Sequence, residues 1–426
     1  MEQTDWKLRL ESGELDAVLT RLYSGDGLTR ARERCERVVE GFEKTFSVQP
    51  SALFSAPGRT ELGGNHTDHQ HGKVLAASVD MDILAAVSPN ESGLIRVQSE
   101  GYPLITVELS QLTPQSGEEN TSAALIRGVC AKLAELGCDL AGKGLDAYMV
   151  SNVLGGSGLS SSAAFEVLIG TILNNLFFDG KCSAVEIAQI GQYAENVFFG
   201  KPSGLMDQTA SSVGGVIAID FADPAYPVVE QVELDLHAKG YALCIIDVHA
   251  SHADLTGEYA AVTEELRRVS RYFGKEVLRE VPEADFYTAL PQVRERAGDR
   301  AILRAIHIYE DNKKVEGELA ALRRGDFDAF LALVNASGLS SWRGLQNVTP
   351  TGYTDHQEAA LALTLCEELL KGKGACRIHG GGFGGTVQAF VPLDMLSEFK
   401  SGMERVLGDS SCHVVSIRPV GGVRLA

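Results

Sequence analysis

The sequence predicts an α+β protein built from two domains. Its 426 residues exceed what a single hydrophobic core usually supports, so two domains are the expected organisation. Segments with strand-like and helix-like patterns follow one another without the strict strand–helix–strand alternation of a parallel α/β sheet. Hydrophobic residues make up 44% of the chain and charged residues 22%, as in an ordinary globular protein. Together these observations favour an α+β architecture.

Apolar periodicity indicates where the individual elements lie. The expected helices cover residues 30–46, 122–136 (with Ser122 as the N-cap), 163–176 and 184–198, followed by a mostly helical region up to residue 370. The expected strands cover residues 74–87, 95–109, 145–150, 213–220 and 241–248, and a strand, a glycine loop and a second strand follow over 375–391. Pro57 and Gly58 are expected to open a loop-rich segment at 54–59, and residues 281–298 are expected to connect two helices.

Charge and composition exclude several classes of protein. The net charge of −19 argues against nucleic-acid binding, because phosphate backbones select basic surfaces. It leaves room for a nucleotide, whose phosphates need only local donors and a metal. No run of about 18 apolar residues is present to cross a membrane, and residues 1–10 do not resemble a secretory signal. The eight cysteines contain no CxxC pair, so neither zinc nor a redox motif is expected. We therefore expect a cytoplasmic protein without nucleic-acid or membrane partners.

A loop rich in glycine and serine, Gly155–Ala164, carries the strongest functional signal. It follows the strand expected over 145–150 and opens the next helix. Its glycines can adopt positive φ and turn backbone N–H groups toward one anion, and the helix N-terminus adds partial positive charge. No Gly-Lys-Ser/Thr sequence closes the loop, so it is not a Walker A motif. A flexible turn is the alternative, but the strand–loop–helix setting favours phosphate binding.

Two further segments concentrate glycines around polar or aromatic side chains. Ala56–Gly72 places polar side chains between glycines, which is typical of a loop that binds a polyhydroxy ligand. Its three histidines and Asp68 lack a recognised metal-ligand spacing, so no metal site is expected there. Gly380–Gly385 lies between two strand-like runs and implies close approach of its backbone to a ligand or another loop, with a tight hairpin as the alternative.

Taken together and in this order, these segments resemble the signatures of the GHMP small-molecule kinases, and within that superfamily those of the galactokinases. Gly58–His69 reads GRTELGGNHTDH, which is similar to the galactokinase motif GRVNLIGEHTDY. Gly158–Ala163 reads GLSSSA and Gly380–Gly385 reads GGGFGG, as in the family. The remaining matches are a GxMDQ element at Gly204–Gln208 and a sugar-contacting EY element at Glu258–Tyr259. Several motifs in order are far more specific than any single glycine loop.

The resemblance covers about residues 56–391 and implies a two-lobed α+β GHMP kinase fold, with ATP and a sugar meeting in the cleft between the lobes. We place the N-terminal lobe at residues 1–214 and the C-terminal lobe at residues 215–426. The implied activity is ATP-dependent phosphorylation of a sugar at its anomeric hydroxyl, with galactose as the leading substrate. Such a transfer depends mainly on positioning and charge stabilisation, so a metal, an anion-binding loop and one base suffice.

The family roles carry over residue by residue to the matching positions. Asp207 matches the catalytic aspartate, and Arg59 matches the arginine that would keep it ionised. Ser162 and Glu195 match the ligands of Mg²⁺, the metal that accompanies ATP. The implied phosphate-binding residues are Gly155, Gly156, Ser157, Gly158, Leu159, Ser160 and Ser161. The implied sugar-binding residues are Asn65, His66, Asp68, Gly204 and Tyr259. Taken singly, each has an ordinary structural explanation, so the inference depends on the joint pattern.

The chain departs from the family pattern mainly on the sugar side. Asn65 stands where the motif has glutamate, and His69 where it has tyrosine. Gly63 replaces an isoleucine, and His379 replaces the threonine before the three glycines. A Ser-His-x-Ser element appears at Ala336–Ser340 without its histidine. The phosphate-transfer residues are intact, so the sequence supports the reaction class more strongly than the choice of sugar.

Two alternatives to a galactose kinase are compatible with these departures. One is a kinase for another sugar, such as an amino sugar or a uronic acid, and the other is a non-catalytic galactokinase-like sugar sensor. The presence of Ser162, Ala163 and Asp207 disfavours the sensor. The Asn65 amide is shorter than glutamate and donates as well as accepts, so Asn65→Glu is expected to move sugar preference toward galactose.

Overall fold

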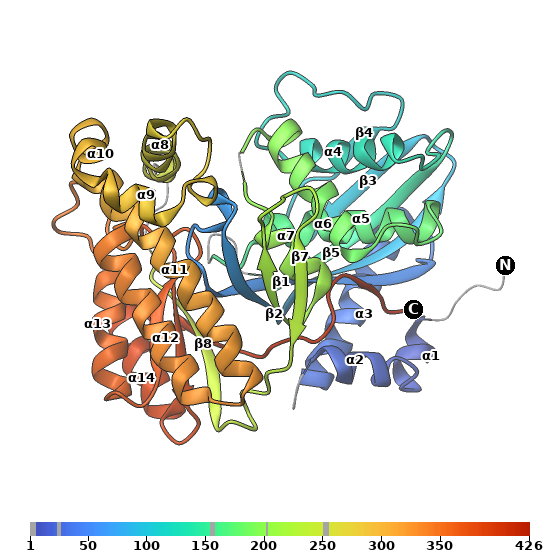
Figure 1. Ribbon diagram of the computed structural model, residues 1–426. Helices are drawn as coiled ribbons and strands as arrows, with labels where there is room; N and C mark the ends of the chain where they lie inside the picture. The colour runs from blue at the N-terminus through green and yellow to red at the C-terminus, as the bar shows by residue number, and fades with distance from the viewer. Residues whose placement is uncertain (1–5, 24–26, 154–157, 202, 250–254) are drawn as a thin grey trace.

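The computed structural model describes residues 6–23, 27–153, 158–201, 203–249 and 255–426, and it consists of two halves with one β-sheet each (Figure 1). An eight-stranded sheet lies in the half drawn on the right, and a four-stranded sheet lies in the half drawn on the left. Helices pack on both faces of each sheet. The mixed, mainly antiparallel arrangement confirms the predicted α+β class.

The eight-stranded sheet is organised around two long antiparallel strands, β1 (Ala52–Gly63) and β2 (Lys73–Asn90). Beyond β2 follow β5 (Gly144–Ser151), β3 (Leu94–Ser99) and β4 (Ile105–Glu108), with β3 and β5 running parallel. The remaining strands are β6 (Val216–Asp220) on β2, β7 (Val228–Val232) on β6, and β12 (Val423–Arg424) on β1.

Both faces of this sheet are covered by helices, which explains the continuous apolar run in β2. Successive side chains of a strand point to opposite faces. Ile83 and Ala85 join the core on one face, and Leu84 and Ala86 join the core on the other. The first face is covered by α4 (Ser122–Glu135), α5 (Ser161–Phe177), α6 (Ala184–Tyr193) and α7 (Met206–Val213). The second is covered by α1 (Trp6–Glu11), α2 (Asp16–Leu22) and α3 (Gly27–Phe46).

The four-stranded sheet has the order β11 (Cys412–Val415), β8 (Tyr241–Asp247), β10 (Thr386–Pro392) and β9 (Ala375–His379). Its neighbouring strands pair antiparallel. One face packs against α12 (Phe327–Ser340), and the other packs against α13 (Glu358–Leu370) and α14 (Leu396–Leu407). A separate apolar core joins α8 (Thr256–Tyr272), α9 (Glu283–Thr288), α10 (Leu290–Ala297) and α11 (Asp299–Arg323).

Two stretches expected to be irregular are regular in the structure. Residues 54–59 lie inside β1, because Pro57 and Gly58 fall at a bulge where the register with β2 shifts. A bulge tolerates proline and glycine within a strand and redirects the side chains that follow it. Residues 281–298 contain α9 and α10 rather than a bare connection, because Phe286 and Val293 are buried in the core of these helices.

Smaller differences concern the ends of predicted elements. Residues 95–109 divide into β3 and β4. Thr121, not Ser122, caps α4, because the Thr121 hydroxyl accepts a hydrogen bond from the backbone N–H of Ala124. The helix expected over 184–198 is α6 followed by a π-helix, Ala194–Phe199. The other predicted helices and strands are confirmed.

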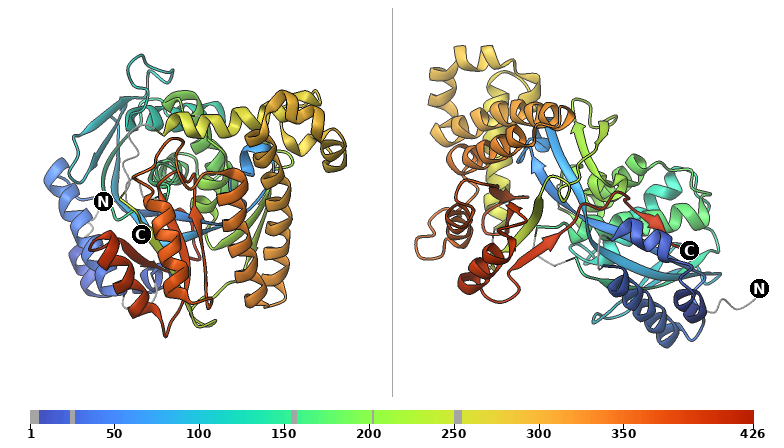
Figure 2. Two further views of the ribbon diagram at one scale, coloured as in Figure 1. Left: turned by 90° about the vertical axis from the view of Figure 1, so that its left-hand side faces the viewer. Right: turned by 90° about the horizontal axis from the view of Figure 1, so that it is seen from below.

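The C-terminal segment crosses from the four-stranded half back to the eight-stranded sheet (Figures 1 and 2). The backbone N–H of Arg418 donates to the Ser78 carbonyl, and Leu425 and Leu53 are joined by a backbone hydrogen bond of 2.7 Å. The boundary at residue 214 stays a prediction, and β6, β7 and β12, which follow it in the sequence, pair in the eight-stranded sheet. Within the part of the chain that the structure describes, no helix combines the length and the apolar character needed to cross a membrane.

Asp82 of β2 joins the N-terminal helices, the central sheet and the C-terminal segment. Its fully buried carboxylate lies 2.6 Å from Arg34 of α3 and 2.9 Å from Arg418. It also accepts hydrogen bonds from the Tyr23 and Ser55 hydroxyls. Burial opposes ionisation, but the two guanidinium groups outweigh it and lower the pKa of Asp82. The N-terminal helices and the C-terminal segment are therefore both held by one charged group.

We predict that Arg418→Leu lowers the free energy of unfolding by about 3–5 kcal/mol, because it leaves part of the buried Asp82 charge uncompensated. Urea unfolding at neutral pH measures this loss. The control is Arg424→Leu, which removes an exposed arginine a few residues away and should change the free energy by less than about 0.5 kcal/mol. Equal losses in the two variants would contradict the role given to Asp82.

Candidate active site

A bidentate arginine–aspartate pair brings two of the predicted site residues together. Arg59 follows the bulge in β1, and Asp207 lies in the first turn of α7. Nε and Nη2 of Arg59 each lie 2.8 Å from a different carboxylate oxygen of Asp207, which fixes the relative orientation of the two groups. The Arg59 side chain is 6% exposed and the Asp207 side chain 31% exposed. Asp207 therefore keeps one side open to a ligand.

The predicted phosphate loop contacts this pair directly. The Ser160 hydroxyl donates to Oδ2 of Asp207, and Nη1 of Arg59 donates to the Gly158 carbonyl. The backbone N–H of Arg59 donates to the Leu159 carbonyl at 3.1 Å. Ser160 has a φ of 55°, which is unfavourable for a residue with a side chain. Its hydroxyl points to Asp207 instead of capping α5, so the local conformation serves the site rather than the helix.

The other residues predicted to bind phosphate are only partly described. Gly155, Gly156 and Ser157 lie outside the described residues. Ser161 is the first residue of α5, so the helix N-terminus, with its unpaired backbone N–H groups, begins beside Ser160 and therefore beside Asp207. ATP binding by the predicted loop stays a prediction.

The surroundings of Asp207 keep its carboxyl ionised. Burial favours the neutral form, but the Arg59 charge and the hydrogen bonds from Arg59 and Ser160 outweigh it, so the pKa of Asp207 is lowered. The N-terminal turn of α7 also favours a negative charge at this position. Asp207 is therefore an anion at neutral pH, with a fixed orientation and free lone pairs.

The two predicted metal ligands also lie together. The Ser162 hydroxyl lies 3.2 Å from Oε1 of Glu195, which the π-helix places beside α5. Lys201 lies 3.1 Å from the same oxygen, and Nε2 of Gln208 donates to Oε2 of Glu195 and to Oε2 of Glu166, both at 2.9 Å. Burial and the neighbouring Glu195 charge raise the pKa of Glu166 well above its ordinary value. The result is one hydroxyl and two carboxyl groups within one small region.

His66, predicted to bind the sugar, is held in an unusual backbone conformation. Its φ is 59°, and its Nε2 lies 2.9 Å from the Gly381 carbonyl. A carbonyl only accepts, so Nε2 carries the proton and Nδ1 is left as an acceptor. Burial, together with the nearby His69, lowers the pKa of His66 to about 3. His66 is therefore a neutral side chain that joins the segment Gly58–His69, called the sugar motif below, to the glycine loop Gly380–Gly385.

The remaining predicted sugar-binding residues line the same region. A Cβ atom on Gly204 would lie 1.9 Å from Oδ2 of Asp68, so this glycine lets the Asp68 carboxylate approach α7. A Cβ atom on Gly381 would lie 2.4 Å from the Tyr259 ring, and the Tyr259 hydroxyl donates to the Gly382 carbonyl at 3.1 Å. The structure thus places Asp68 beside Gly204 and Tyr259 on the glycine loop, and sugar binding by these residues stays a prediction.

Asn65 occupies a different environment from its predicted neighbours. Its side chain is completely buried, and its Nδ2 donates to Oε1 of Glu61 at 3.0 Å and to the Gly380 carbonyl at 2.6 Å. Its Oδ1 accepts from Asn347 at 2.7 Å and from Ser341 at 3.2 Å. The amide's two donors and two acceptor positions are all used within the protein. Direct sugar contact by Asn65 stays a prediction that would require at least one of these bonds to break.

At two of the departures from the family pattern, a histidine makes buried hydrogen bonds. His379, in place of threonine, accepts from the Glu61 backbone N–H at 3.1 Å and bonds Thr386 at 2.9 Å through its other nitrogen. Burial and nearby arginine charges keep the pKa of His379 well below its ordinary value, so its ring is neutral. The Ser-His-x-Ser element lacks its histidine, and its last serine, Ser340, is instead hydrogen-bonded at 2.9 Å to His307 of α11.

Several residues of this site were not identified from the sequence. Glu61 is fully buried and lies 2.5 Å from Arg377 of β9. The sequence could have identified Glu61, because the galactokinase motif has asparagine where this chain has glutamate. Burial raises the pKa of Glu61 to about 7, and Arg377 limits the rise. Glu166 gave no signal, because only the folded chain joins it to Glu195 through Gln208. Lys201 gave none either, because its contact with Glu195 arises from the turn after the π-helix.

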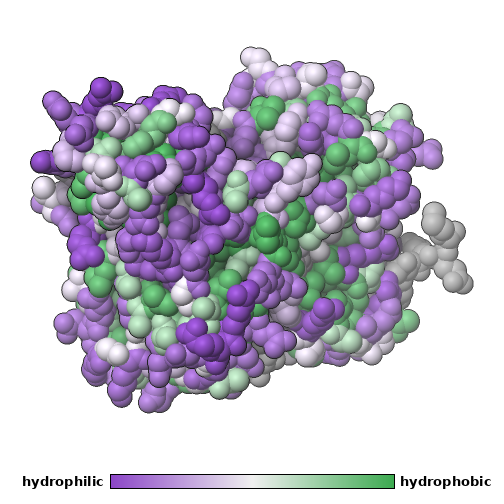
Figure 3. All heavy atoms as spheres, viewed as in Figure 1, coloured by the Kyte–Doolittle hydropathy of each residue, from purple (hydrophilic) through white to green (hydrophobic). Residues whose placement is uncertain are grey.

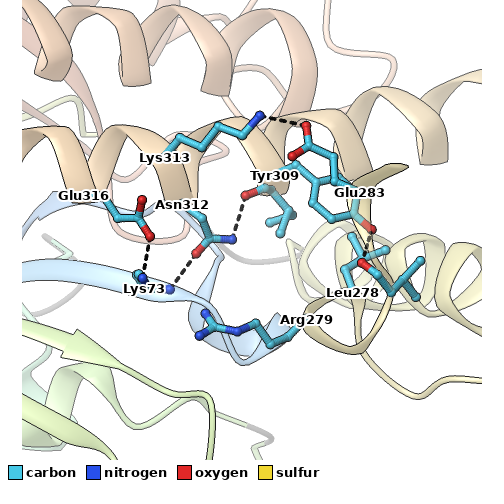
Figure 4. A pocket seen from close by; sticks show the side chains of 10 residues that line it. Lys73, Leu278, Arg279, Glu283, Tyr309, Asn312, Lys313 and Glu316 are labelled. Atoms are coloured by element: carbon cyan, nitrogen blue, oxygen red, sulfur yellow. Dashed lines mark hydrogen bonds and ion pairs between the residues drawn. The ribbon is translucent and has the colours of Figure 1, made fainter. Parts of the chain in front are cut away.

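The surface is hollowed between the two halves at the top of the molecule as drawn in Figure 3. A separate hollow of about 250 Å³ lies behind the sugar motif, where Lys73, Asn312 and Glu316 meet (Figure 4). The Lys73 backbone N–H donates to Asn312 at 2.6 Å, and the Lys73 ammonium group pairs with Glu316. The other charged side chains of its lining are also in ion pairs. The bonds around this hollow connect the start of β2 to α11, and every charged side chain of its lining is already paired.

Comparison with known proteins identifies the family. Residues 40–89 match the galactokinase galactose-binding signature, and residues 124–215 match the N-terminal domain of GHMP kinases. The galactokinase of Streptomyces coelicolor is 33% identical over 359 residues, which are 83% of this chain and 88% of that protein. The chain belongs to the galactokinase family.

Solved structures agree with this assignment. The structure of Lactococcus lactis galactokinase in complex with galactose superposes with a TM-score of 0.77 at 27% identity, covering 91% of this chain and 99% of that one. The mevalonate kinase of Methanococcus jannaschii gives a TM-score of 0.59 at 13% identity, covering 86% of this chain and 98% of that one. The second likeness concerns the fold alone and confirms the GHMP kinase architecture predicted for this sugar kinase.

We predict that Arg59→Leu moves the acid limb of the kcat/KM profile upward by about 1–3 pH units, because burial then raises the pKa of Asp207 with only the weaker influence of Lys201 and Ser160 to oppose it. Arg59→Lys keeps a positive charge and should move the limb less. The control is Arg405→Leu, an exposed arginine on α14, which should leave the limb in place. An unchanged limb in Arg59→Leu would show that Arg59 does not set the ionisation of Asp207.

Proposed function

We propose that this protein transfers the γ-phosphoryl group of ATP to the anomeric hydroxyl of galactose, giving galactose 1-phosphate and ADP. The observation that carries the proposal is the bidentate pair of Arg59 and Asp207, joined to the predicted phosphate loop through Ser160 and Gly158. The family assignment supports the reaction, and the match to the galactose-binding signature supports the sugar. Neither another sugar nor a non-catalytic sensor is favoured by these matches.

In this proposal, Asp207 orients the anomeric hydroxyl and accepts its proton. The hydroxyl oxygen forms a bond to the γ-phosphorus, and the bond from that phosphorus to the ADP oxygen breaks. A carboxylate has about four lone-pair positions, so Asp207 can accept the sugar hydroxyl while bonded to Arg59 and Ser160. The exposed side of its carboxylate is where that hydroxyl would lie.

Arg59 has a second task during the transfer. Its five N–H groups exceed the three that bond Asp207 and the Gly158 carbonyl, so two remain to face the transferred phosphoryl group. A fixed positive charge beside the developing negative charge lowers the barrier without reorganisation. The serines at the start of α5 and the N-terminus of that helix would hold the phosphates of ATP.

Magnesium fits the residues that would hold it. Ser162 and Glu195 offer hydroxyl and carboxylate oxygens 3.2 Å apart, the donor type that a hard cation prefers. Among the described residues, no cluster of three or more His, Cys, Asp or Glu side chains is arranged as a metal site, which suits a metal completed by phosphates and water. Bound there, the ion would neutralise charge on the ATP phosphates. Lys201, now paired with Glu195, would then be free to turn toward the phosphates.

His66, Asp68, Gly204 and Tyr259 would hold the sugar hydroxyls. Neutral His66 offers Nδ1 as an acceptor, and the Asp68 carboxylate accepts as well, so both suit hydroxyl donors. We also place the protein in the cytoplasm without nucleic-acid or membrane partners. All eight cysteines are free, as in a reducing compartment, and the net charge of −19 suits neither kind of surface.

The test of this function is ADP release measured with a panel of sugars that includes galactose, glucose, galactosamine and galacturonic acid. The proposal expects galactose to give the highest kcat/KM. A higher value for an amino sugar or a uronic acid would reassign the substrate, and no sugar-dependent ADP release would favour a sensor.

We predict that Asp207→Asn lowers turnover on the order of 10²-fold or more, because the amide cannot accept the hydroxyl proton. The substitution changes one atom, so ATP binding should stay near that of the parent protein. Stopped assays of ADP release and calorimetric ATP titration provide the two measurements. Near-normal turnover would remove Asp207 from the mechanism.

We predict that Glu195→Gln raises the Mg²⁺ concentration needed for half-maximal activity and leaves the affinity for galactose nearly unchanged, because the amide loses the charge that attracts the metal. The matched control is Glu186→Gln on α6, a carboxylate that caps its own helix away from Ser162. A loss of galactose affinity with an unchanged metal requirement would contradict the assignment.

A further inference from the structure

Three departures from the galactokinase motif fall at alternate positions of one short segment. The family motif has asparagine, isoleucine and glutamate where this chain has Glu61, Gly63 and Asn65. The carboxylate and the amide have therefore exchanged positions, with the residue between them reduced to glycine. All three residues are buried, so the exchange concerns the interior of the site.

The exchanged pair is in direct contact. Oε1 of Glu61 accepts from Nδ2 of Asn65 at 3.0 Å and from Nη2 of Arg377 at 2.5 Å. Arg377 also donates to the Leu62 carbonyl at 2.9 Å. The guanidinium group therefore holds β9 against β1 and supplies the positive charge that Glu61 needs in a buried position.

Asn65 uses its amide to hold the glycine loop. Its Nδ2 donates to the Gly380 carbonyl at 2.6 Å, which a carboxylate at this position could not do. The next residue, His66, donates to the Gly381 carbonyl at 2.9 Å. Asn347 also joins Asn65 to the loop, because its Nδ2 donates to Oδ1 of Asn65 at 2.7 Å and to the Gly381 carbonyl at 3.2 Å. Asn65 and His66 thus hold successive carbonyls of the loop on which Tyr259 rests.

The small residue between the pair accommodates a further buried acid. A Cβ atom on Gly63 would lie 1.9 Å from Oε2 of Glu318, so the Glu318 carboxyl fills the space that a larger side chain would need. Neither oxygen of Glu318 has a hydrogen-bond partner in the described structure. Asp311, on the same helix, instead accepts from the Asn65 backbone N–H at 3.0 Å. The three motif changes therefore belong to one rearranged polar layer beneath the sugar motif.

We propose that Glu61 is a positioning residue for sugar binding, acting through Asn65 on His66 and the Gly380–Gly382 loop. Asn65, whose amide is saturated by protein groups, then makes no hydrogen bond to the sugar, and His66 and Asp68 carry the recognition. This inference rests on the proposed function. It predicts that the two exchanged side chains depend on each other, and that a carboxylate at position 65 impairs galactose binding instead of improving it.

The test is a double-mutant cycle with Glu61→Gln, Asn65→Asp and the combined variant, since each substitution changes one atom and endangers folding least. The readouts are kcat and KM for galactose, KM for ATP, and galactose affinity by calorimetry. Each single variant should raise the galactose KM and dissociation constant about 10- to 100-fold and change the ATP KM less than about threefold. The combined variant should be at least about fivefold better than the product of the single effects, because an amide again faces a carboxylate.

A second pair, Glu61→Asn with Asn65→Glu, restores the order of the family motif and should show the same mutual rescue. The matched control is Glu318→Gln, a buried carboxyl of the same layer without a partner, which should change the galactose KM less than about twofold. An equal loss in this control would mean that any buried carboxyl has the effect, and the assignment to Glu61 would fall.

Two other outcomes would overturn the inference. Single effects that simply multiply in both combined variants would show that Glu61 and Asn65 act independently. Tighter galactose binding in Asn65→Asp or Asn65→Glu alone would show that position 65 contacts the sugar. If the unchanged protein phosphorylates galactose in the same assays, either result removes this inference alone. If it does not, the proposed function fails as well.

Discussion

The structure depends on keeping one carboxylate, Asp207, ionised in a largely buried site. Burial by itself would neutralise Asp207, and Arg59 prevents this with two hydrogen bonds of 2.8 Å. The requirement fixes the positions of three elements. A bulge in β1 directs Arg59 toward Asp207, α7 begins at that point, and the strained backbone of Ser160 turns its hydroxyl to the same group. The long strands and covering helices hold these elements in place.

A second layer of buried polar residues connects the Arg59–Asp207 pair to the residues proposed to bind the sugar. Glu61 lies two residues from Arg59 on the same strand and pairs with Arg377 of β9 across the two halves. Asn65 and His66 then attach the sugar motif to the glycine loop between β9 and β10. Because these bonds cross from one sheet to the other, the same contacts set the relative position of the halves and hold the residues proposed to bind the sugar.

The sequence pointed to the local motifs that the structure brings together, namely the glycine- and serine-rich loop at Gly158–Ser161, the aspartate at the start of α7 and the glycine loop at Gly380–Gly385, while phosphate binding by the first loop stays a prediction. It misplaced residues 54–59, because proline and glycine indicate a loop locally, whereas pairing with β2 makes a bulged strand. Glu166 was missed because only tertiary packing brings it to Gln208 and, through Gln208, to Glu195. Lys201 was missed because its contact with Glu195 depends on the turn that ends the π-helix, which no sequence motif indicated. For Asn65 the sequence identified the unusual position, but its protein partners come from distant segments such as Ser341 and Asn347.

The central claim is that Asp207 activates the anomeric hydroxyl of galactose for attack on ATP. The most direct test is a phosphorus–proton correlation spectrum of the product formed from galactose and ATP. The account predicts one phosphorus signal coupled to the anomeric proton, and formation of this product on the order of 10²-fold more slowly or worse with Asp207→Asn. A phosphoryl group on any other carbon, or release of ADP and inorganic phosphate without a sugar phosphate, would contradict it.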